Sequence, residues 1–147
     1  MAALMLIDGR IVVVRHRRGR QEYHLLPGGG VDYRETLEQA LVREVAEETG
    51  LTCSVGRPLI INDTIDPDGT RHVVNITFEA TIISGSITDS PKDPLVAAVE
   101  LIDPSDIESL DFRPPIAKEL HRAAREGAHF HALYAGSLFV PERDGRG

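Results

Sequence analysis

Three residues close to the end of one predicted helix are best placed to do chemistry: Glu44, Glu47 and Glu48. At about 100° per residue, Glu44 and Glu48 fall on one face of that helix, and Glu47 lies at the edge of the same face. Like charges at this spacing repel one another, and the negative end of the helix dipole adds to the repulsion. Carboxylate oxygens are ligands that Mg²⁺ and Mn²⁺ prefer. The pattern therefore indicates a divalent metal site; the ordinary alternative is a solvated acidic face.

The helix that carries these glutamates is predicted over residues 35–49. Leu37, Leu41 and Val45 recur every four residues and form its apolar face, and Gly50 is typical of a helix end. The glutamates continue this apolar face, whereas a solvated acidic face would lie opposite it. Such a departure from local rules favours a functional site.

Two neighbours of the three glutamates could complete the site. Arg43 precedes Glu47 by four residues and can reach its carboxylate, either as an ordinary helix pair or to orient a metal ligand. The run Gly28-Gly29-Gly30 precedes the helix, and glycine permits a close approach of the backbone. This segment can therefore place a carbonyl or an amide in the site.

The remaining segments predict an α/β fold. Strands before and after the central helix, with a second helix late in the chain, suit a mixed sheet between helices. Within residues 70–83, alternation predicts a buried face made of Val74, Ile76, Phe78 and Ala80. The predicted strands are 2–7, 11–15, 23–26, 57–66, 70–83 and 96–102, with a turn at Asp8-Gly9-Arg10, loops at 16–22 and 84–94, a helical turn at 103–110 and a helix at 115–125.

Composition limits the class of protein. The 147 residues, 41% of them hydrophobic, suit one domain over 1–147, with a flexible tail beyond about residue 141. A formal net charge of -7 disfavours nucleic acid partners. Cys53 is the only cysteine, and His129 and His131 are the only close pair of histidines, so neither a disulfide nor a zinc centre is expected. The N-terminus lacks a basic leader, and no apolar run approaches the roughly 20 residues that span a bilayer. We therefore expect a cytoplasmic protein without a membrane segment.

The stretch from residue 29 to residue 51 resembles the Nudix box, G-x5-E-x7-R-E-U-x-E-E-x-G-U, in which U is aliphatic. Every defined position is filled, by Gly29, Glu35, Arg43, Glu44, Val45, Glu47, Glu48, Gly50 and Leu51. The resemblance implies a Nudix-type α/β/α sandwich with a mixed β-sheet. It also implies hydrolysis of the pyrophosphate bond in a nucleoside diphosphate linked to another moiety.

The resemblance further implies roles for individual residues. Arg43 would orient a glutamate, and Glu35 would support the loop–helix structure through a salt bridge. Magnesium or manganese would be bound by the carbonyl of Gly28 and by the carboxylates of Glu44, Glu47 and Glu48.

The chemistry of such a site requires an attacking water and a base. Metal ions lower the pKa of a bound water and hold it in line with phosphorus, and a glutamate accepts the proton. Glu47 and Glu48 are the candidates for that base. A downstream carboxylate could take part, and the candidates are Asp89, Asp93 and Glu100, although a surface or turn position is the favoured interpretation of each.

Phosphate contacts are predicted in the basic segment and the glycine run. Arginine forks match phosphate oxygens, although a solvated basic loop explains the same residues. Tyr23 and Phe78 could stack on a base or ribose, or belong to the core. The predicted substrate contacts are Arg15, Arg17, Gly29 and Gly30, and the same basic segment also holds Arg18 and Arg20.

The substrate is the least determined property. Pro67, sixteen residues after Leu51, matches a proline associated with ADP-ribose hydrolysis, although Asp66-Pro67-Asp68-Gly69 is also an ordinary turn. ADP-ribose is therefore slightly favoured, and nucleoside triphosphates are the alternative. A catalytically silent nucleotide sensor and an RNA 5′-end hydrolase are weaker alternatives. The sequence leaves the oligomeric state open, and a homodimer is one possibility because many family members are dimers.

Overall fold

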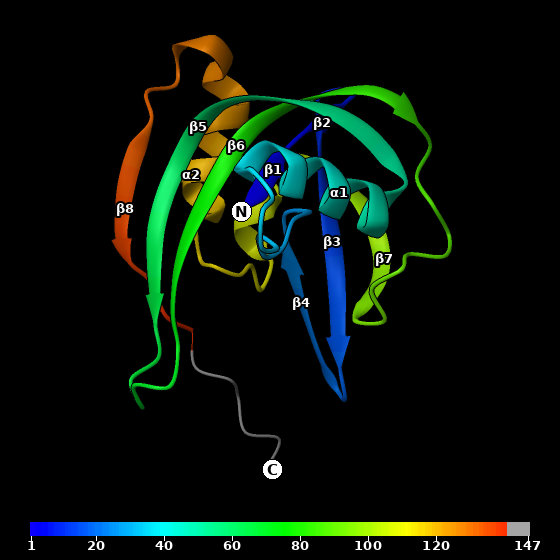
Figure 1. Cartoon of the computed structure of the whole chain (residues 1–147). Coiled ribbons are helices and arrows are strands. Elements are labelled where there is room, and N and C mark those ends of the chain that lie inside the picture. Colours follow the sequence, from blue (N-terminus) through cyan, green and yellow to red (C-terminus); the bar gives the residue numbers. More distant parts are fainter. Residues whose placement is uncertain (141–147) are drawn as a thin grey trace.

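Two four-stranded sheets lie between two helices in the computed structural model, which describes residues 1–140 (Figure 1). The predicted flexible tail beyond residue 141 lies outside these residues. The elements in chain order are β1 (Ala2–Leu4), β2 (Leu6–Ile7), β3 (Arg10–Arg18), β4 (Gln21–Leu25), α1 (Leu37–Thr49), β5 (Leu51–Ile65), β6 (His72–Gly85), β7 (Val96–Ile102), the 3-10 turn η1 (Ile107–Ser109), α2 (Ala117–Glu126), the 3-10 turn η2 (Gly127–His129) and β8 (Leu133–Ser137).

The first sheet is mixed and the second is antiparallel. In the first, with strand order β1-β6-β5-β8, β5 and β6 are antiparallel, while β1 pairs parallel with β6 and β8 pairs parallel with β5. In the second, β3 pairs antiparallel with β2, β4 and β7.

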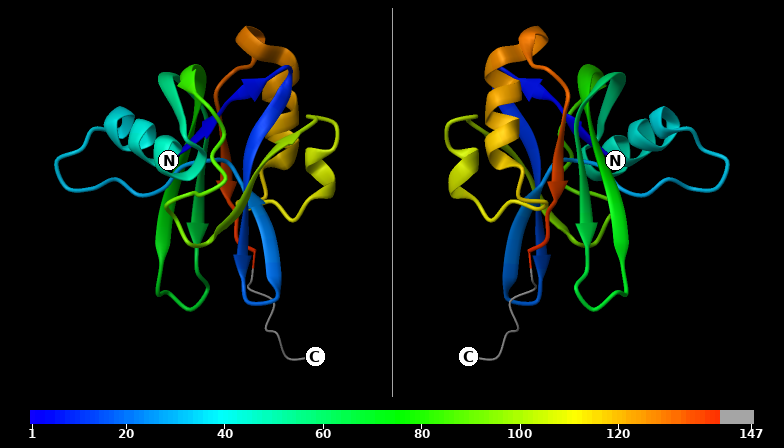
Figure 2. Two further views of the ribbon diagram at one scale, coloured as in Figure 1. Left: turned by 90° about the vertical axis from the view of Figure 1, so that its right-hand side faces the viewer. Right: turned by 90° about the vertical axis from the view of Figure 1, so that its left-hand side faces the viewer.

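The two helices cover opposite sides of the sheets, as Figure 2 shows. Strand β3 contributes to both interfaces because successive side chains point to opposite faces of a strand. Val12 packs in the cluster with Leu41 and Val45 of α1, whereas Ile11 and Val13 pack in the cluster with α2. The predicted α/β/α sandwich with a mixed sheet is confirmed. Within residues 1–140, no helix is both long enough and apolar enough to cross a membrane.

Helix α1 starts at Leu37, two residues later than predicted. Thr36 caps it: its hydroxyl accepts from the amide of Gln39 at 3.2 Å, and the Gln39 side chain accepts from the amide of Thr36 at 2.9 Å. Gly50 ends it in the left-handed region at φ 78°, as predicted. The expectation that Leu37 is buried is wrong, because the side chain is 43% exposed in the first turn, which extends beyond the sheet.

Residues 16–22 form a hairpin, and the predicted loop there is wrong. Strand β3 continues to Arg18, and β4 begins at Gln21 after a turn that contains Gly19 at φ 62°. The cross-strand pair of Arg17 and Glu22 places opposite charges side by side, which allows a highly charged sequence to remain in a strand. The predicted turn at Asp8-Gly9 is present, with both residues at positive φ.

The predicted core face of β6 is only partly correct. Ala80 is buried and Phe78 packs against the α1 cluster, so the core interpretation of Phe78 is the correct one. Val74 is instead 58% exposed and Thr77 is buried. Pairing with β5 is irregular near this region, with register shifts around Pro58, and such irregularities disturb simple alternation. Strand β8 was not predicted.

Candidate functional site

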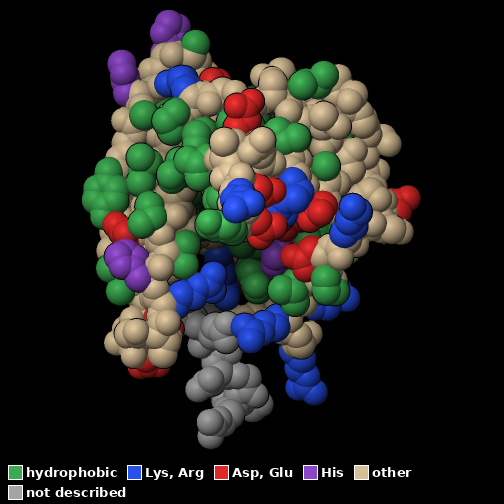
Figure 3. Space-filling model, viewed as in Figure 1, with side chains coloured by type: hydrophobic (Ala, Val, Ile, Leu, Met, Phe, Trp, Pro, Cys, Tyr) green, Lys and Arg blue, Asp and Glu red, His purple; other side chains and the backbone are tan. Residues whose placement is uncertain are grey.

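The last two turns of α1 carry the three predicted glutamates at different depths. Glu48 is 3% exposed, whereas the side chains of Glu44 and Glu47 are 19% and 36% exposed. Figure 3 shows acidic and basic side chains gathered over α1, above a hollow between the β5–β6 and β3–β4 hairpins. A buried carboxylate needs compensating partners, so the surroundings of Glu48 indicate how the site is built.

The glycine segment lies directly against two of the carboxylates. The amide of Gly28 donates to Oε2 of Glu48 at 2.9 Å. A Cβ added at Gly29 would lie 2.4 Å from Cδ of Glu44, and one added at Gly28 would lie 2.1 Å from the carbonyl oxygen of Met1. At Gly30 a Cβ would meet no atom within 4 Å. Gly28 is therefore required by a close approach of the backbone, a Cβ at Gly29 would displace the Glu44 carboxylate, and Gly30 has open space beside it.

Arg43 joins the loop before α1 to the carboxylates. Its Nε and Nη2 donate to the two oxygens of Glu35 at 2.7 and 2.9 Å, and its Nη1 donates to Glu44 at 2.9 Å. The distance from Nη1 to Glu47, the partner expected from sequence, is longer at 3.5 Å. The forked contact with Arg43 and the amide of Asp32 lower the pKa of Glu35 to about 2, and Glu35 and Glu44 raise the pKa of Arg43.

His16 was not identified from the sequence, yet β3 places it beside Glu48. The residue is 9% exposed, and its Nε2 lies 3.8 Å from Oε1 of Glu48. Asp93, one of three candidate downstream carboxylates, completes a cluster with these two, in which one ligand atom from each lies within 4.8 Å of the others. The alternation of β3 could have located His16, had residues 16–18 been recognised as strand.

The other two downstream carboxylates have different surroundings. Glu100 on β7 accepts from Nε of Arg15 at 2.7 Å and lies 3.1 Å from Nε2 of His24. Asp89 is exposed in the loop before β7. The structure thus brings Asp93, and neither Glu100 nor Asp89, into the cluster with Glu48.

The predicted phosphate contacts Arg15 and Arg17 form ion pairs on β3. Arg15 contacts Glu22 and Glu100, and Arg17 contacts Glu22. Both arginines alternate with His16 along the strand and so point to the opposite face. The roles of Arg15, Arg17, Gly29 and Gly30 in substrate binding stay predictions. Arg18 and Arg20 lie at the exposed end of the same hairpin.

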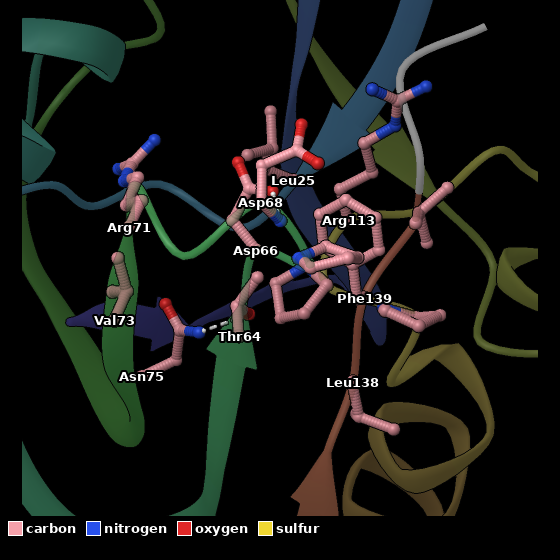
Figure 4. A pocket seen from close by; sticks show the side chains of 14 residues that line it. Leu25, Thr64, Asp66, Asp68, Arg71, Val73, Asn75, Arg113, Leu138 and Phe139 are labelled. Atoms are coloured by element: carbon pink, nitrogen blue, oxygen red, sulfur yellow. Dashed lines mark hydrogen bonds between the residues drawn. The ribbon is translucent and has the colours of Figure 1, made fainter.

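A cavity of about 640 Å³ opens between the β5–β6 turn and the segment before α2 (Figure 4). Arg71 and Arg113 come from opposite sides of it, and Pro67 belongs to its wall. The other lining residues are Leu25, Thr64, Asp66, Asp68, Val73, Asn75, Pro114, Pro115, Leu138, Phe139 and Val140.

A continuous chain of contacts leads from the carboxylates to this cavity. The ring of His16 lies 5.5 Å from the ring of Tyr23, centroid to centroid, and Cζ of Arg113 lies 4.3 Å from the centroid of Tyr23. The lining of the cavity includes none of the three glutamates, so it is packed side chains, from Glu48 through His16 and Tyr23 to Arg113, that connect the two regions. Tyr23 thus lies between the two parts of the site.

The donor set fits a hard divalent cation. Arg43 contacts both Glu44 and Glu47, and the glycine segment contacts both Glu44 and Glu48, so the three carboxylates share neighbours. A Cβ on Gly29 would occupy the space that the Glu44 carboxylate uses. Oxygen-rich surroundings of this kind suit Mg²⁺ or Mn²⁺.

Comparison with known proteins identifies relatives of similar sequence. The chain is 36% identical over 81 residues to an ADP-ribose pyrophosphatase of Methanocaldococcus jannaschii, covering 54% of this chain and 48% of the relative. It is 36% identical over 90 residues to the NAD-capped RNA hydrolase NudC of Escherichia coli, covering 61% of this chain and 34% of the relative. The matches thus span about half and about a third of those proteins.

A solved structure shares the architecture over most of the chain. A NUDIX hydrolase from Nitrosomonas europaea superposes with a TM-score of 0.74 at 21% identity, covering 90% of each chain. The family model described as NUDIX domain matches residues 1–123. This match includes the whole box and the strands that surround it, and on this ground the chain belongs to the NUDIX domain family.

Proposed function

We propose that this protein hydrolyses the pyrophosphate bond of a nucleoside diphosphate linked to another moiety, with ADP-ribose as substrate and AMP and ribose 5-phosphate as products. The observation that carries the proposal is the arrangement of Glu44, Glu47 and Glu48 beside the glycine segment, with a contact path to a cavity. Of the similar proteins, one is an ADP-ribose pyrophosphatase and another is an NAD-capped RNA hydrolase. ADP-ribose and NAD both contain AMP joined through a pyrophosphate.

Glu44, Glu47, Glu48 and the carbonyl of Gly28 would hold Mg²⁺ or Mn²⁺. When bound, the ion would offset phosphate charge and make a water more acidic. Arg43 keeps Glu44 in place and neutralises part of the carboxylate charge. Gly28 fixes Glu48 by donating its amide hydrogen to Oε2.

Glu47 is the favoured proton acceptor. Its carboxylate is the most exposed of the three, and its contact with Arg43 is long, whereas Glu48 is buried and hydrogen-bonded. In the reaction a water oxygen attacks phosphorus, Glu47 takes the water proton, and the bond from phosphorus to the bridging oxygen breaks. The bridging oxygen leaves on the second phosphate.

The cavity would hold the part of the substrate beyond the scissile bond. Its volume of about 640 Å³ lies in the usual range for small-molecule sites. Pro67, Leu25 and Pro115 offer apolar surface for a base or ribose, while Arg71 and Arg113 offer guanidinium groups for phosphate oxygens. Pro67 serves the turn as well, because Asp66 organises that turn through the amide of Asp68.

The test is a product analysis with ADP-ribose, NAD and a panel of nucleoside triphosphates. Each is incubated with Mg²⁺, with Mn²⁺ and with EDTA, and products are separated by anion-exchange chromatography. AMP from ADP-ribose that disappears with EDTA and with Glu47→Gln is the expected result. Pyrophosphate and a nucleoside monophosphate would instead assign the triphosphate activity. Absence of turnover on the whole panel would favour a ligand-sensing role.

A further inference from the structure

His16 has an unusual position for a buried histidine. Its side chain points from β3 toward the end of α1, and within residues 1–140 its Nε2 makes no hydrogen bond. The nearest acidic atom, Oε1 of Glu48, is 3.8 Å away, too far for a hydrogen bond. A buried nitrogen without a partner is destabilising unless something else satisfies it. The nitrogen is therefore available to a ligand that comes from outside the described residues.

Asp93 is held near this nitrogen by the loop before β7. The amide of Lys92 donates to the carbonyl of Glu47 at 3.0 Å, and the amide of Thr88 donates to the carbonyl of Thr49 at 2.9 Å. These bonds satisfy carbonyls that the end of α1 leaves free, so the loop is tied to the helix. The loop consequently presents Asp93 to the same region as Glu48.

We propose that His16, Glu48 and Asp93 together hold one divalent ion, and that the imidazole makes this site favour cobalt-like transition ions over Mg²⁺. Two ligand atoms that each lie about 2.1 Å from a common ion are about 3.0 to 4.2 Å apart, depending on the angle at the metal. The 3.8 Å between Nε2 of His16 and Oε1 of Glu48 fits this range. All three ligand atoms lie within 4.8 Å of one another, so small side-chain shifts would bring them to bonding distance from one ion. Imidazole is a good ligand for transition ions, whereas Mg²⁺ prefers oxygen.

A second enclosed histidine in the same sheet provides a contrast. His24 on β4 is also largely enclosed, and its Nδ1 is buried without a partner, but its Nε2 lies 3.1 Å from Oε2 of Glu100, within hydrogen-bond distance. His16 faces an acidic cluster without such a bond. The two histidines therefore differ in what surrounds them: within residues 1–140, the group of three potential metal ligands includes His16 and not His24.

The experiment measures metal binding without substrate. Co²⁺ and Mg²⁺ affinities of the full chain are determined by calorimetry for wild type, His16→Gln and Asp93→Asn, with His24→Gln and Asp89→Asn as matched controls. His16→Gln should weaken Co²⁺ binding about tenfold or more and change Mg²⁺ affinity far less. Asp93→Asn should weaken both, and the two controls should change neither. Thermal unfolding in EDTA establishes that each variant is folded.

A second measurement uses the wild-type protein alone. Adding Zn²⁺ should shift the ¹⁵N resonance of His16 Nε2 and leave that of His24 unchanged. An unchanged Co²⁺-to-Mg²⁺ affinity ratio in folded His16→Gln, or an unshifted His16 resonance, would overturn the proposal. The inference rests on the proposed function, because Glu48 is a metal ligand in both. Because binding is measured without substrate, a failure of hydrolysis and a failure of this site remain distinguishable.

Discussion

Replacing Gly29 by alanine is expected to displace Glu44 while leaving the fold intact. The added Cβ would lie 2.4 to 2.7 Å from the three carboxyl atoms of Glu44, about 1 Å short of ordinary contact. Only the far end of a flexible side chain must move, so the strain is small. The carboxylate would retreat by about 1 Å from the new Cβ, and this shift would disturb its hydrogen bond from Arg43, now 2.9 Å long.

The expected loss follows from how strictly such a site must be positioned. A misplacement of about 1 Å can reduce turnover about 10²-fold, equivalent to about 2.7 kcal/mol in the barrier. The fold should tolerate the change, because alanine reduces the freedom of the unfolded chain. We therefore expect kcat to fall about 10²-fold for Gly29→Ala, with a Tm within about 2 °C of wild type.

The adjacent glycines are matched controls for this prediction. Gly30→Ala meets no atom within 4 Å and keeps the backbone groups through which residue 30 would contact substrate, so it should keep wild-type kcat and Tm. Gly28→Ala meets the backbone of Met1 and Ala2 at 2.1 and 2.6 Å, and this overpacking should lower stability by about 1–3 kcal/mol. Steady-state kinetics and thermal unfolding of all three variants make the test. A kcat of Gly29→Ala within about threefold of the kcat of Gly30→Ala would refute the reasoning.

Other perturbations test the carboxylate network, its arginine and the core. Glu47→Gln should lower kcat about 10²- to 10⁴-fold without lowering Tm, and near-wild-type turnover at saturating Mg²⁺ would contradict its role. Arg43→Lys should weaken Mg²⁺ binding measured by calorimetry about tenfold or more, since an ammonium cannot reproduce the fork to Glu35; unchanged affinity would count against the network. In the folded protein the pKa of Glu35 is about 2, below its ordinary value of 4.5. The contribution of Glu35 to the free energy of unfolding is therefore present above pH 4.5 and is lost as the pH falls toward 2. The Tm difference between wild type and Glu35→Gln, measured by scanning calorimetry, should shrink across that window, and a constant difference would refute this. Burial raises the pKa of the Cys53 thiol, so a thiol reagent should react only in denaturant; rapid reaction in buffer would show the thiol to be accessible.

The central helix and its carboxylates could be predicted because they depend on local signals. The cap at Thr36, the four-residue repeat of Leu41 and Val45, and the glycine at residue 50 all act within one or two turns. A helix has a fixed angle per residue, so the spacing of Glu44 and Glu48 already determines that they share a face. The metal-site hypothesis follows from this regularity, whereas the fold class was predicted from the order of strands and helices and from the resemblance to the Nudix box.

Side-chain contacts that depend on how loops and strands fold together could not be predicted in this way. Arg43 contacts Glu35 more closely than Glu47 because the loop before α1 folds back over the helix, which no helical spacing describes. Glu100 is paired with Arg15 and His24 because β3 lies between β4 and β7, and strand order is a long-range property.

The sequence by itself therefore determined the helix, its three glutamates and the family to which they belong. Only the tertiary structure decided that His16 and Asp93, which are 77 residues apart in the chain, meet at Glu48. The physical reason is the range of the interactions. Helix periodicity and capping are set by residues within a few positions, whereas the meeting of a strand and a distant loop depends on sheet register and on backbone hydrogen bonds to the end of α1.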